Sequence, residues 1–465
     1  MVYLYLLATL LFVFGIKRLG SIRTCLQGNR LSEVGMLVAI VTVLLVGTNV
    51  NWAVVIAGML VGGGIGLVLA KRTQTTEMPE MVAALNGFGG VASALVAMAE
   101  LLLNNRLKQD GVSLGDLGIV PAVANPATII VGMVTLTGSF VAYGKLSGKK
   151  LSHPFAGGAR HAFHAALALG AIAMSTWLVM TGSHLQMTFA VILLALVAST
   201  LGVFLVMPIG GADMPVVVSL LNSYSGIAAA FAGFVIASPL LIVVGALVGA
   251  SGLILTQIMC KAMNRSLGNV LLGGMGGEET QAADAKDYKS IKSTTPEEVA
   301  MLLDGASSCI IVPGYGLAVA QAQHVVKDLA DQLQKRGCQV RYAIHPVAGR
   351  MPGHMNVLLA ESDVPYDQLW EMDRINSDFK NTDVAIVVGA NDVVNPAARE
   401  NTGPIAGMPI LDVDQARTVV VIKRSLSPGY AGIRNPLFDL PNCLMVFLDA
   451  KEALEGIVKE VKELK

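Results

Sequence analysis

Hydrophobic and polar positions divide the chain into two parts. Up to about Lys261, long apolar stretches follow one another with few charges between them, and after Glu278 charges become as frequent as in a soluble domain. A helix needs about 20 apolar residues to cross the hydrocarbon layer of a membrane. The pattern therefore predicts nine membrane-spanning helices, centred near residues 10, 40, 60, 91, 132, 171, 196, 226 and 250.

The second part alternates short apolar runs with helical or polar stretches. It follows a glycine-rich, then polar segment, which we interpret as a flexible linker over residues 263–290. In TTPEEVAMLLDGA, a Thr cap and acidic first-turn residues then predict the start of a helix. Six apolar runs predict the strands of a parallel, doubly wound sheet: residues 308–312, 339–344, 356–361, 383–389, 418–422 and 443–448.

The expected organisation is multi-domain. We predict an all-α transmembrane helix bundle over residues 1–262, the linker, and a Rossmann-like α/β domain with a six-stranded parallel sheet over residues 291–465. Positive loops stay on the cytoplasmic side of a membrane. Lys and Arg gather in the odd-numbered loops, with Arg106 and Lys108 in the fourth loop as exceptions. We therefore expect an external N-terminus and an α/β domain on the cytoplasmic side of the membrane.

Composition narrows the chemistry. The chain has 33 basic and 33 acidic residues and no basic run, which argues against nucleic-acid binding. Its five cysteines lack metal-binding spacing, so we predict reduced thiols. His161 and His164 open the sixth predicted span without a third ligand, so no metal site is expected.

Glycines and polar residues mark the predicted spans. Gly58, Gly62 and Gly66 form one small-residue face, and Gly245 and Gly249 form another; both are typical of close helix packing. Polar residues inside spans are functional candidates, because burying them in lipid is costly.

Two spans carry such polar residues. Asn86 lies on the fourth span and Asn222 on the eighth, about 13–14 Å along the helix from Asp213 at 1.5 Å per residue. These amides either bond helix to helix or line a water path, and the pattern leaves both open. Asp213 directly precedes Met214 and Pro215, which also fits a helix N-cap.

A glycine turn lies in CIIVPGYGLAVAQAQHVV, residues 309–326. A β-branched run, the turn at Gly314 and Gly316, and a helix-forming stretch follow in the order of a dinucleotide-binding fingerprint. Ala318 or Val319 stands in place of its third glycine. Helix-start amides favour phosphate, while an ordinary strand-to-helix turn remains the alternative.

The strand ends indicate the nucleotide. The run 339–344 ends without the Asp or Glu that would bind a ribose 2′-hydroxyl. Lys423, Arg424 and Ser425 follow the run 418–422, and two cations and a hydroxyl suit a 2′-phosphate. The prediction is NADP(H), with a solvated basic strand end as the alternative. No nucleophile-and-base constellation accompanies it, so the chain holds a cofactor without an organic substrate site.

Long motifs resemble a known family. GYGLAVAQAQ, HPVAGRMPGHMNVLLAE, GANDVVNPAA, KRSLSPGYAGIRNPLF, EMPEMVAALNGFGG, GADMPVVVSLLNSYSG and GASGLILTQIMCKAMNRS are similar to the beta subunit of proton-translocating nicotinamide nucleotide transhydrogenase, over essentially the whole chain. The resemblance implies hydride transfer of the Si-specific/Re-specific AB type between NADH and NADP+, coupled to proton movement. It implies NADP(H) on this chain, NAD(H) on a separate alpha subunit, and a homodimer of alpha-beta units in the lipid of a bacterial inner membrane. A dinucleotide-gated ion transporter with a sensing Rossmann domain is the alternative function.

The resemblance also implies site residues. Arg350 would meet the pyrophosphate, Asn391 and Asp392 the nicotinamide side, with Asp392 as the catalytic candidate, and Tyr430 would cover the nucleotide, which the family binds in reversed orientation. Asn86 stands where some members have histidine, and an amide does not titrate. The implied cofactor residues are Gly314, Tyr315, Gly316, Ala318, Val319, Gly349, Arg350, Met351, Pro352, Gly389, Asn391, Asp392, Lys423, Arg424, Ser425, Gly429, Tyr430 and Ala431, and the implied proton-path residues are Asn86, Ser139, Asp213, Asn222 and Gly252.

Overall fold

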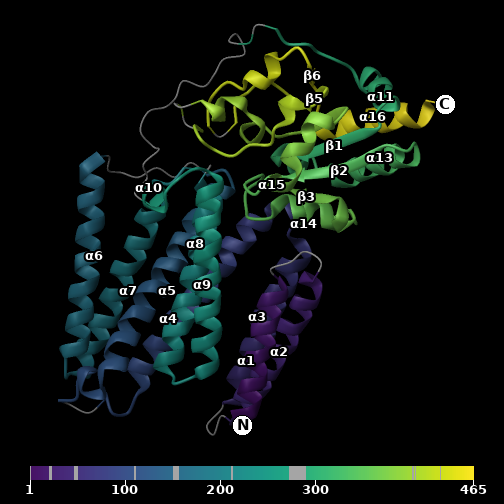
Figure 1. The fold of residues 1–465 in the computed structure, drawn as a ribbon. Coiled ribbons are helices and arrows are strands. Elements are labelled where there is room, and N and C mark those ends of the chain that lie inside the picture. The colour runs from purple at the N-terminus through teal and green to yellow at the C-terminus, as the bar shows by residue number, and fades with distance from the viewer. Residues whose placement is uncertain are drawn as a thin grey trace. The chain divides into compact units, whose positions relative to one another are not determined.

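The chain separates into two compact units. One comprises Met1–Ile209 and Val217–Thr256, and the other Gly210–Val216 and Gln257–Lys465. Figure 1 gives the labels of the elements. The structure, a computed structural model, describes residues 2–19, 24–46, 51–108, 111–149, 157–210, 213–271, 288, 290–400, 403, 405–429 and 431–464.

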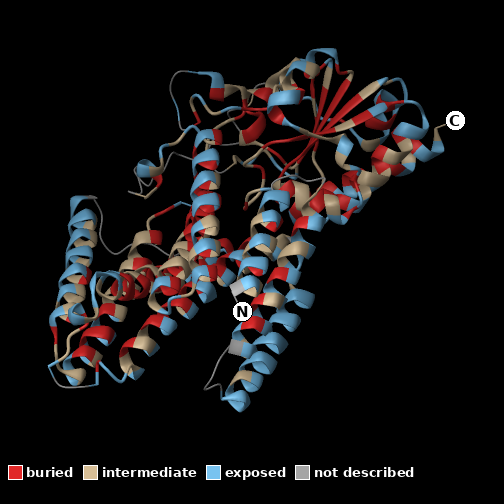
Figure 2. Cartoon of the chain, turned by 60° about the horizontal axis from the view of Figure 1, so that its bottom comes forward, coloured by how far each residue is buried: buried red, intermediate tan, exposed pale blue. Residues whose placement is uncertain are grey.

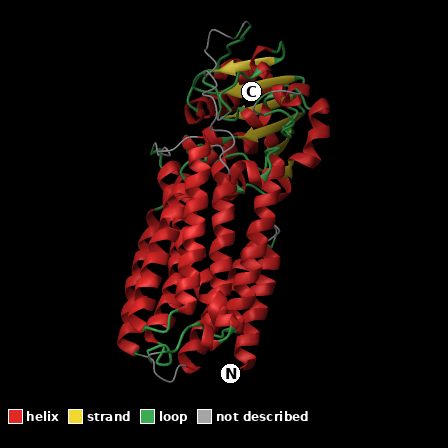
Figure 3. Cartoon of the chain, turned by 90° about the vertical axis from the view of Figure 1, so that its left-hand side faces the viewer, coloured by secondary structure: helices red, strands yellow, loops and turns green. Residues whose placement is uncertain are grey.

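Nine long α-helices precede the sheet in these residues, and each lies close to a predicted span. Eight of them, α2 to α9, are long and apolar enough to cross a membrane, and the shorter α1 lies at the first predicted span. Figure 3 draws the long helices in red; α1 packs against α2, and α5 packs against α4 and α7. Their bounds are α1 Val2–Leu19, α2 Cys25–Val46, α3 Trp52–Arg72, α4 Met78–Leu103, α5 Ile119–Leu146, α6 Gly157–Met180, α7 His184–Val206, α8 Met214–Val235 and α9 Pro239–Ala262, followed by the short α10 Leu267–Leu271.

Glycines bring α8 against α9, as predicted. A Cβ atom added at Gly245 would lie 2.4 Å from the Ala230 nitrogen, and one at Gly226 would lie 2.5 Å from the Gly249 nitrogen. Neither glycine could become alanine without moving a backbone, so the glycines set the distance between these helices.

The glycines of α3 behave differently. A Cβ atom added at Gly58, Gly62 or Gly66 meets nothing within 4 Å in the described part of this chain, and α3 has no buried residue. The close packing expected for this face is therefore not found within the chain.

The second unit contains a six-stranded, all-parallel sheet in the order β3-β2-β1-β4-β5-β6. This is a doubly wound, Rossmann-like order, as expected from the alternation of apolar runs. The strand order reverses between β1 and β4, which is where such folds bind ligands. The strands are β1 Ser308–Pro313, β2 Gln339–Ile344, β3 Leu369–Glu371, β4 Val384–Val388, β5 Thr418–Ile422 and β6 Cys443–Val446.

One predicted strand is wrong. Residues 356–361 belong to helix α14, His354–Glu361, and the third strand is the short β3 further along. A six-residue apolar run without clear periodicity fits a buried helix as well as a strand. Leu358 and Leu359 are buried on the helix. Strand β3 has only three residues, and none is fully buried. Its sequence therefore needs no apolar run from which the strand could be predicted.

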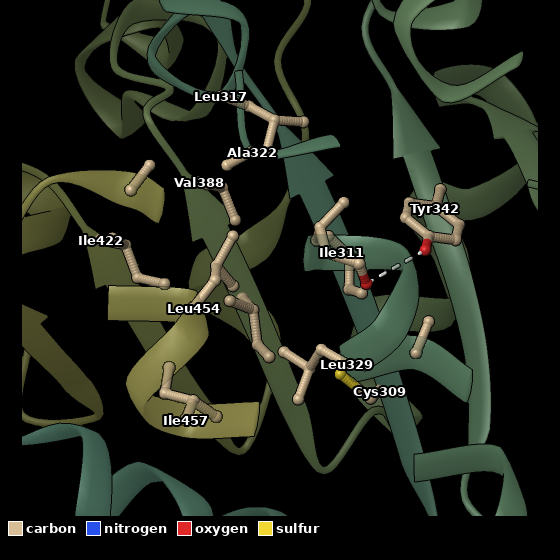
Figure 4. Packing of buried hydrophobic residues seen from close by; sticks show 14 of the residues in the cluster. Cys309, Ile311, Leu317, Ala322, Leu329, Tyr342, Val388, Ile422, Leu454 and Ile457 are labelled. Atoms are coloured by element: carbon tan, nitrogen blue, oxygen red, sulfur yellow. Dashed lines mark hydrogen bonds between the residues drawn. The ribbon is translucent and has the colours of Figure 1, made fainter. Parts of the chain in front are cut away.

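The sheet is buried on both faces, which explains the continuous apolar runs of its strands (Figure 2). On one face, side chains of the strands pack against helices α11 Pro296–Asp304, α13 Gln323–Lys335, α14 and α16 Ala450–Glu463. Figure 4 shows Leu329, Leu454 and Ile457 packed toward the strand residues Ile311, Val388 and Ile422. The other face packs under α15 Met372–Ile375 and the short 3-10 turns at residues 376–381 and 436–439. The rigid sheet thus positions the loops at its carboxyl edge.

Candidate functional site

Two adjoining cavities lie where β1, β4 and β5 end. The first has a volume of about 470 Å³, the second about 330 Å³, and Gly389, Lys423 and Pro428 line both. These volumes fall in the usual range for a small-molecule site. Of the predicted cofactor residues, Gly314, Tyr315, Gly349, Arg350, Gly389, Asn391, Asp392, Lys423, Gly429 and Ala431 line the first cavity, and Gly316, Val319, Gly389, Lys423, Arg424 and Ser425 line the second.

Three described residues among those predicted line neither cavity. Ala318 and Met351 are buried in the protein, and Pro352 lines neither cavity. Tyr430, predicted to cover the nucleotide, lies outside the described residues.

The glycine turn after β1 packs against the end of β4. The Gly314 nitrogen donates to the Val388 carbonyl at 2.8 Å, and the Gly316 nitrogen donates to the Gly389 carbonyl at 2.9 Å. A Cβ atom at Gly316 would lie 2.6 Å from the Gly389 Cα atom. Both glycines therefore serve the contact between two backbones, whatever ligand lies nearby.

The helix after this turn is shorter than its sequence indicates. Helix α12, Tyr315–Val319, has five residues, and the chain turns at Gln321, with φ of 50°, before α13 begins. A single helical turn has little macrodipole, so the phosphate-binding expectation based on a helix start is weakened.

Arg350 is held at the cavity wall by two neighbours. Its guanidinium carbon lies 4.4 Å from the centre of the Tyr315 ring, a cation–π distance. Its backbone nitrogen donates to Nδ1 of His354 at 3.0 Å. His354 is fully buried, and burial together with the Arg350 charge lowers its pKa to about 4. Sequence reasoning missed His354; the only signal was a histidine four residues after Arg350.

Asp392 joins two segments of the cavity wall. Its Oδ2 accepts a hydrogen bond from the Ala431 nitrogen at 3.1 Å, and a Cβ atom at Gly429 would lie 2.4 Å from its Oδ1. The neighbouring Asn391 carbonyl accepts from Nδ2 of Asn435 at 3.2 Å. The carboxylate thus supports the segment that follows β5.

A cationic and hydroxyl-rich cluster lies at the end of β5. Lys423 donates to the Ser427 carbonyl, and burial lowers its pKa to about 8, an effect that the charge of Asp392 opposes. The hydroxyls of Ser425 and Ser427 are 2.9 Å apart, and Arg424 is exposed beside them. Charged donors and hydroxyls converging on one cavity suit a phosphate dianion.

A comparison with known protein families identifies the family of this chain. Residues 1–460 match the family described as NAD(P) transhydrogenase beta subunit. The chain belongs to this family. It is similar to two proteins named NAD(P) transhydrogenase subunit beta, one from Rhodospirillum rubrum and one from a strain of the same species. Each is 47% identical over 461 residues, which cover 98% of this chain and 97% of the relative.

Among the predicted polar residues of the spans, Asn86 makes a contact between helices. Asn86 on α4 is buried, and its Nδ2 donates to the Val218 carbonyl on α8 at 3.2 Å. Asn222 is half-buried. For Asn86, this contact corresponds to the helix-to-helix interpretation.

Two further predicted residues lie in the packed interior. Ser139 on α5 is fully buried, and its hydroxyl has no hydrogen-bond partner in the described part of the chain. A Cβ atom at Gly252 on α9 would lie 2.8 Å from the Ser223 Cα atom, so α8 and α9 touch at that level. The Ser139 hydroxyl is therefore a polar group in a closely packed interior.

Asp213 makes an ion pair that sequence reasoning missed. Its Oδ2 lies 3.2 Å from a guanidinium nitrogen of Arg265, and the side chains are 8% and 16% exposed. Burial raises the pKa of Asp213, while the charge of Arg265 lowers it. Its Oδ1 has no partner in the described residues, and the predicted N-cap bond to α8 is not among its contacts.

Proposed function

We propose that this chain binds NADP(H) and exchanges hydride with NAD(H) held by a separate alpha subunit, while protons cross the membrane through its helices. The observation that carries the proposal is the cluster of Lys423, Arg424 and Ser425 in a cavity that adjoins the larger cavity at the strand ends. A 2′-phosphate distinguishes NADP(H) from NAD(H), and this cluster matches its charge.

The residues of the chain would bind and orient the nucleotide. Lys423 and Arg424 neutralise the 2′-phosphate, Arg350 meets the pyrophosphate, and Asn391 and Asp392 lie toward the nicotinamide. When bound, NADP(H) supplies the hydride acceptor or donor. Asp392 acts by supporting the wall segment at Ala431, because its carboxylate already accepts that backbone N–H.

The proton route is proposed for the spans. Ser139 and Asn222 provide polar groups within the membrane, Asn86 braces α4 against α8, and Gly252 allows α9 to approach. None of Asn86, Ser139 and Asn222 titrates near neutral pH, so their role would be to organise water. Asp213 lies just before α8, and we place its ion pair with Arg265 at the cytoplasmic end, where the loop charges put the nucleotide domain.

Co-purification with the alpha subunit tests the proposal. The chain alone is expected to bind NADPH far more tightly than NADH and to transfer no hydride from NADH to an NADP+ analogue. Adding the alpha subunit restores transfer and coupled proton movement in bacterial membrane vesicles. Nucleotide-dependent ion flux without redox turnover would instead support the ion-transporter alternative.

A further inference from the structure

His354 lies behind the loop that carries Arg350. It is the first residue of α14 and has no exposed surface. Its Nδ1 accepts the backbone N–H of Arg350 at 3.0 Å. Its ring centre lies 6.4 Å from that of Tyr315, on which the Arg350 guanidinium stacks. The side chains of Arg350 in the loop, Tyr315 of α12 and His354 of α14 therefore form one cluster.

The hydrogen bond requires one form of the imidazole. A nitrogen that accepts a hydrogen bond carries no proton, so the proton of the neutral ring is on Nε2. A charged imidazolium donates from both nitrogens and could not accept the Arg350 N–H. The buried surroundings and the neighbouring guanidinium both favour the neutral ring.

The loop has little freedom to adopt another shape around this ring. Gly349 has a φ of 103°, a conformation that other residues rarely adopt, and a Cβ atom there would lie 2.5 Å from Nδ1 of His354. The loop backbone therefore lies directly against the ring. Without this acceptor, the backbone N–H of Arg350 would lose its hydrogen bond to His354. The loop would then lower its free energy by moving so that this N–H can bond to water.

We propose that His354 is a positioning residue for nucleotide binding. Its Nδ1 fixes the backbone of Gly349 and Arg350, so that the guanidinium stays on Tyr315 at the wall of the larger cavity. The part that concerns affinity rests on the proposed function, since it takes the anion at Arg350 to be the diphosphate of NADP(H). The part that concerns the loop stands without any nucleotide.

Hydrogen exchange and NADPH binding, measured on the full chain in detergent, test the proposal. His354→Leu removes the acceptor at similar volume, whereas His354→Asn places an amide oxygen near the position of Nδ1. The exposed His324, changed to Asn, is the matched control. Without nucleotide, we expect amide exchange at Arg350 to accelerate at least about tenfold in the Leu variant and to stay within about threefold of wild type in the Asn variant. NADPH affinity should fall by about tenfold or more in the Leu variant alone.

The outcomes separate the two levels of the inference. Unchanged exchange at Arg350 in His354→Leu overturns the positioning role. If the Leu variant does not fold, His354→Gln replaces it, because the glutamine oxygen reaches toward Nε2 rather than Nδ1. Equal exchange in the Asn and Gln variants then overturns the role as well. If wild type fails to bind NADPH, the proposed function fails, while the exchange result still decides what His354 does.

Discussion

The side chains of Asp213 and Arg265 form a largely buried ion pair with an N···O distance of 3.2 Å. The two residues are 52 positions apart, and helices α8 and α9 lie between them in sequence. Helix α8 begins directly after Asp213, and Arg265 follows the end of α9. The ion pair therefore connects the start of α8 to the segment after α9, and these two helices also contact each other at their glycines. Removing one partner leaves the other charge partly buried and unpaired, which is costly.

We expect Asp213→Asn to weaken the coupling between nucleotide state and proton uptake. Proton-coupled turnover should fall several-fold, while hydride exchange through bound NADP(H), which needs no net proton movement, should survive. Vesicles with a pH dye and a cyclic hydride-exchange assay measure the two quantities. Glu455→Gln, in the exposed pair with Lys451, is the control. A wild-type proton-to-hydride ratio and rate in Asp213→Asn would contradict the coupling role.

Asn222→Leu should slow proton-coupled turnover by replacing a polar group of α8 with an apolar one. Cyclic hydride exchange should again survive, because the nucleotide site is untouched. Leu221, buried beside it on α8, changed to Met, is the control for repacking of the helix. If the Leu variant pumps at the normal rate, the Asn222 amide serves packing alone.

Lys423 and Arg424 should determine nucleotide preference. Changing both to Ala removes the charges that we propose to face the 2′-phosphate, and we expect NADPH affinity to fall by about 100-fold or more while NADH affinity changes little. Calorimetry with both nucleotides measures the difference. Lys459 of α16, changed to Ala, controls for the loss of a surface charge. Equal wild-type affinities for NADPH and NADH would refute the cofactor assignment.

NADPH affinity should depend on pH through Lys423. In the free protein its pKa is lowered to about 8, and a phosphate dianion favours the charged form. Affinity contributed by this group is therefore fully present below pH 8 and falls as pH rises above 8, by at most about tenfold per pH unit. Lys423→Arg should abolish this fall, because guanidinium stays charged. A wild-type profile that is flat between pH 7 and about 10 would contradict the prediction.

Gly316→Ala should destabilise the nucleotide domain even without nucleotide. Its Cβ atom would lie 2.6 Å from the Gly389 Cα atom, so two backbones must separate. Overpacking of this kind costs about 1–3 kcal/mol. The apparent melting temperature of the apo protein should fall, while Gly305→Ala, where nothing lies within 4 Å, should leave it unchanged. A normal apo melting temperature with lost NADPH binding would instead assign Gly316 to the ligand.

Much of the fold could be predicted from local pattern. The long apolar stretches located the long helices, and the β-branched runs located five of the six strands. Strands that are buried on both faces of a parallel sheet consist of continuous apolar residues, so their runs are visible in the sequence. The run at residues 356–361 failed because its apolar residues fit either structure, and only the neighbours of α14 decided for a helix. Strand β3 at the sheet edge has only three residues and contains no continuous apolar run.

The candidate site, like the fold, could be predicted from the sequence only in its local features. The sequence by itself determined the residue types that bear charge and flexibility, such as Lys423, Arg424 and the glycines of the turn, since these are local signatures. Only the tertiary structure decided that Gly316 serves a contact with Gly389, that His354 holds the backbone of Arg350, and that Arg265 pairs with Asp213. The physical reason is that hydrogen bonds, ion pairs and close backbone contacts join atoms brought together by folding, and the amino-acid pattern at either end of such a contact does not name its partner.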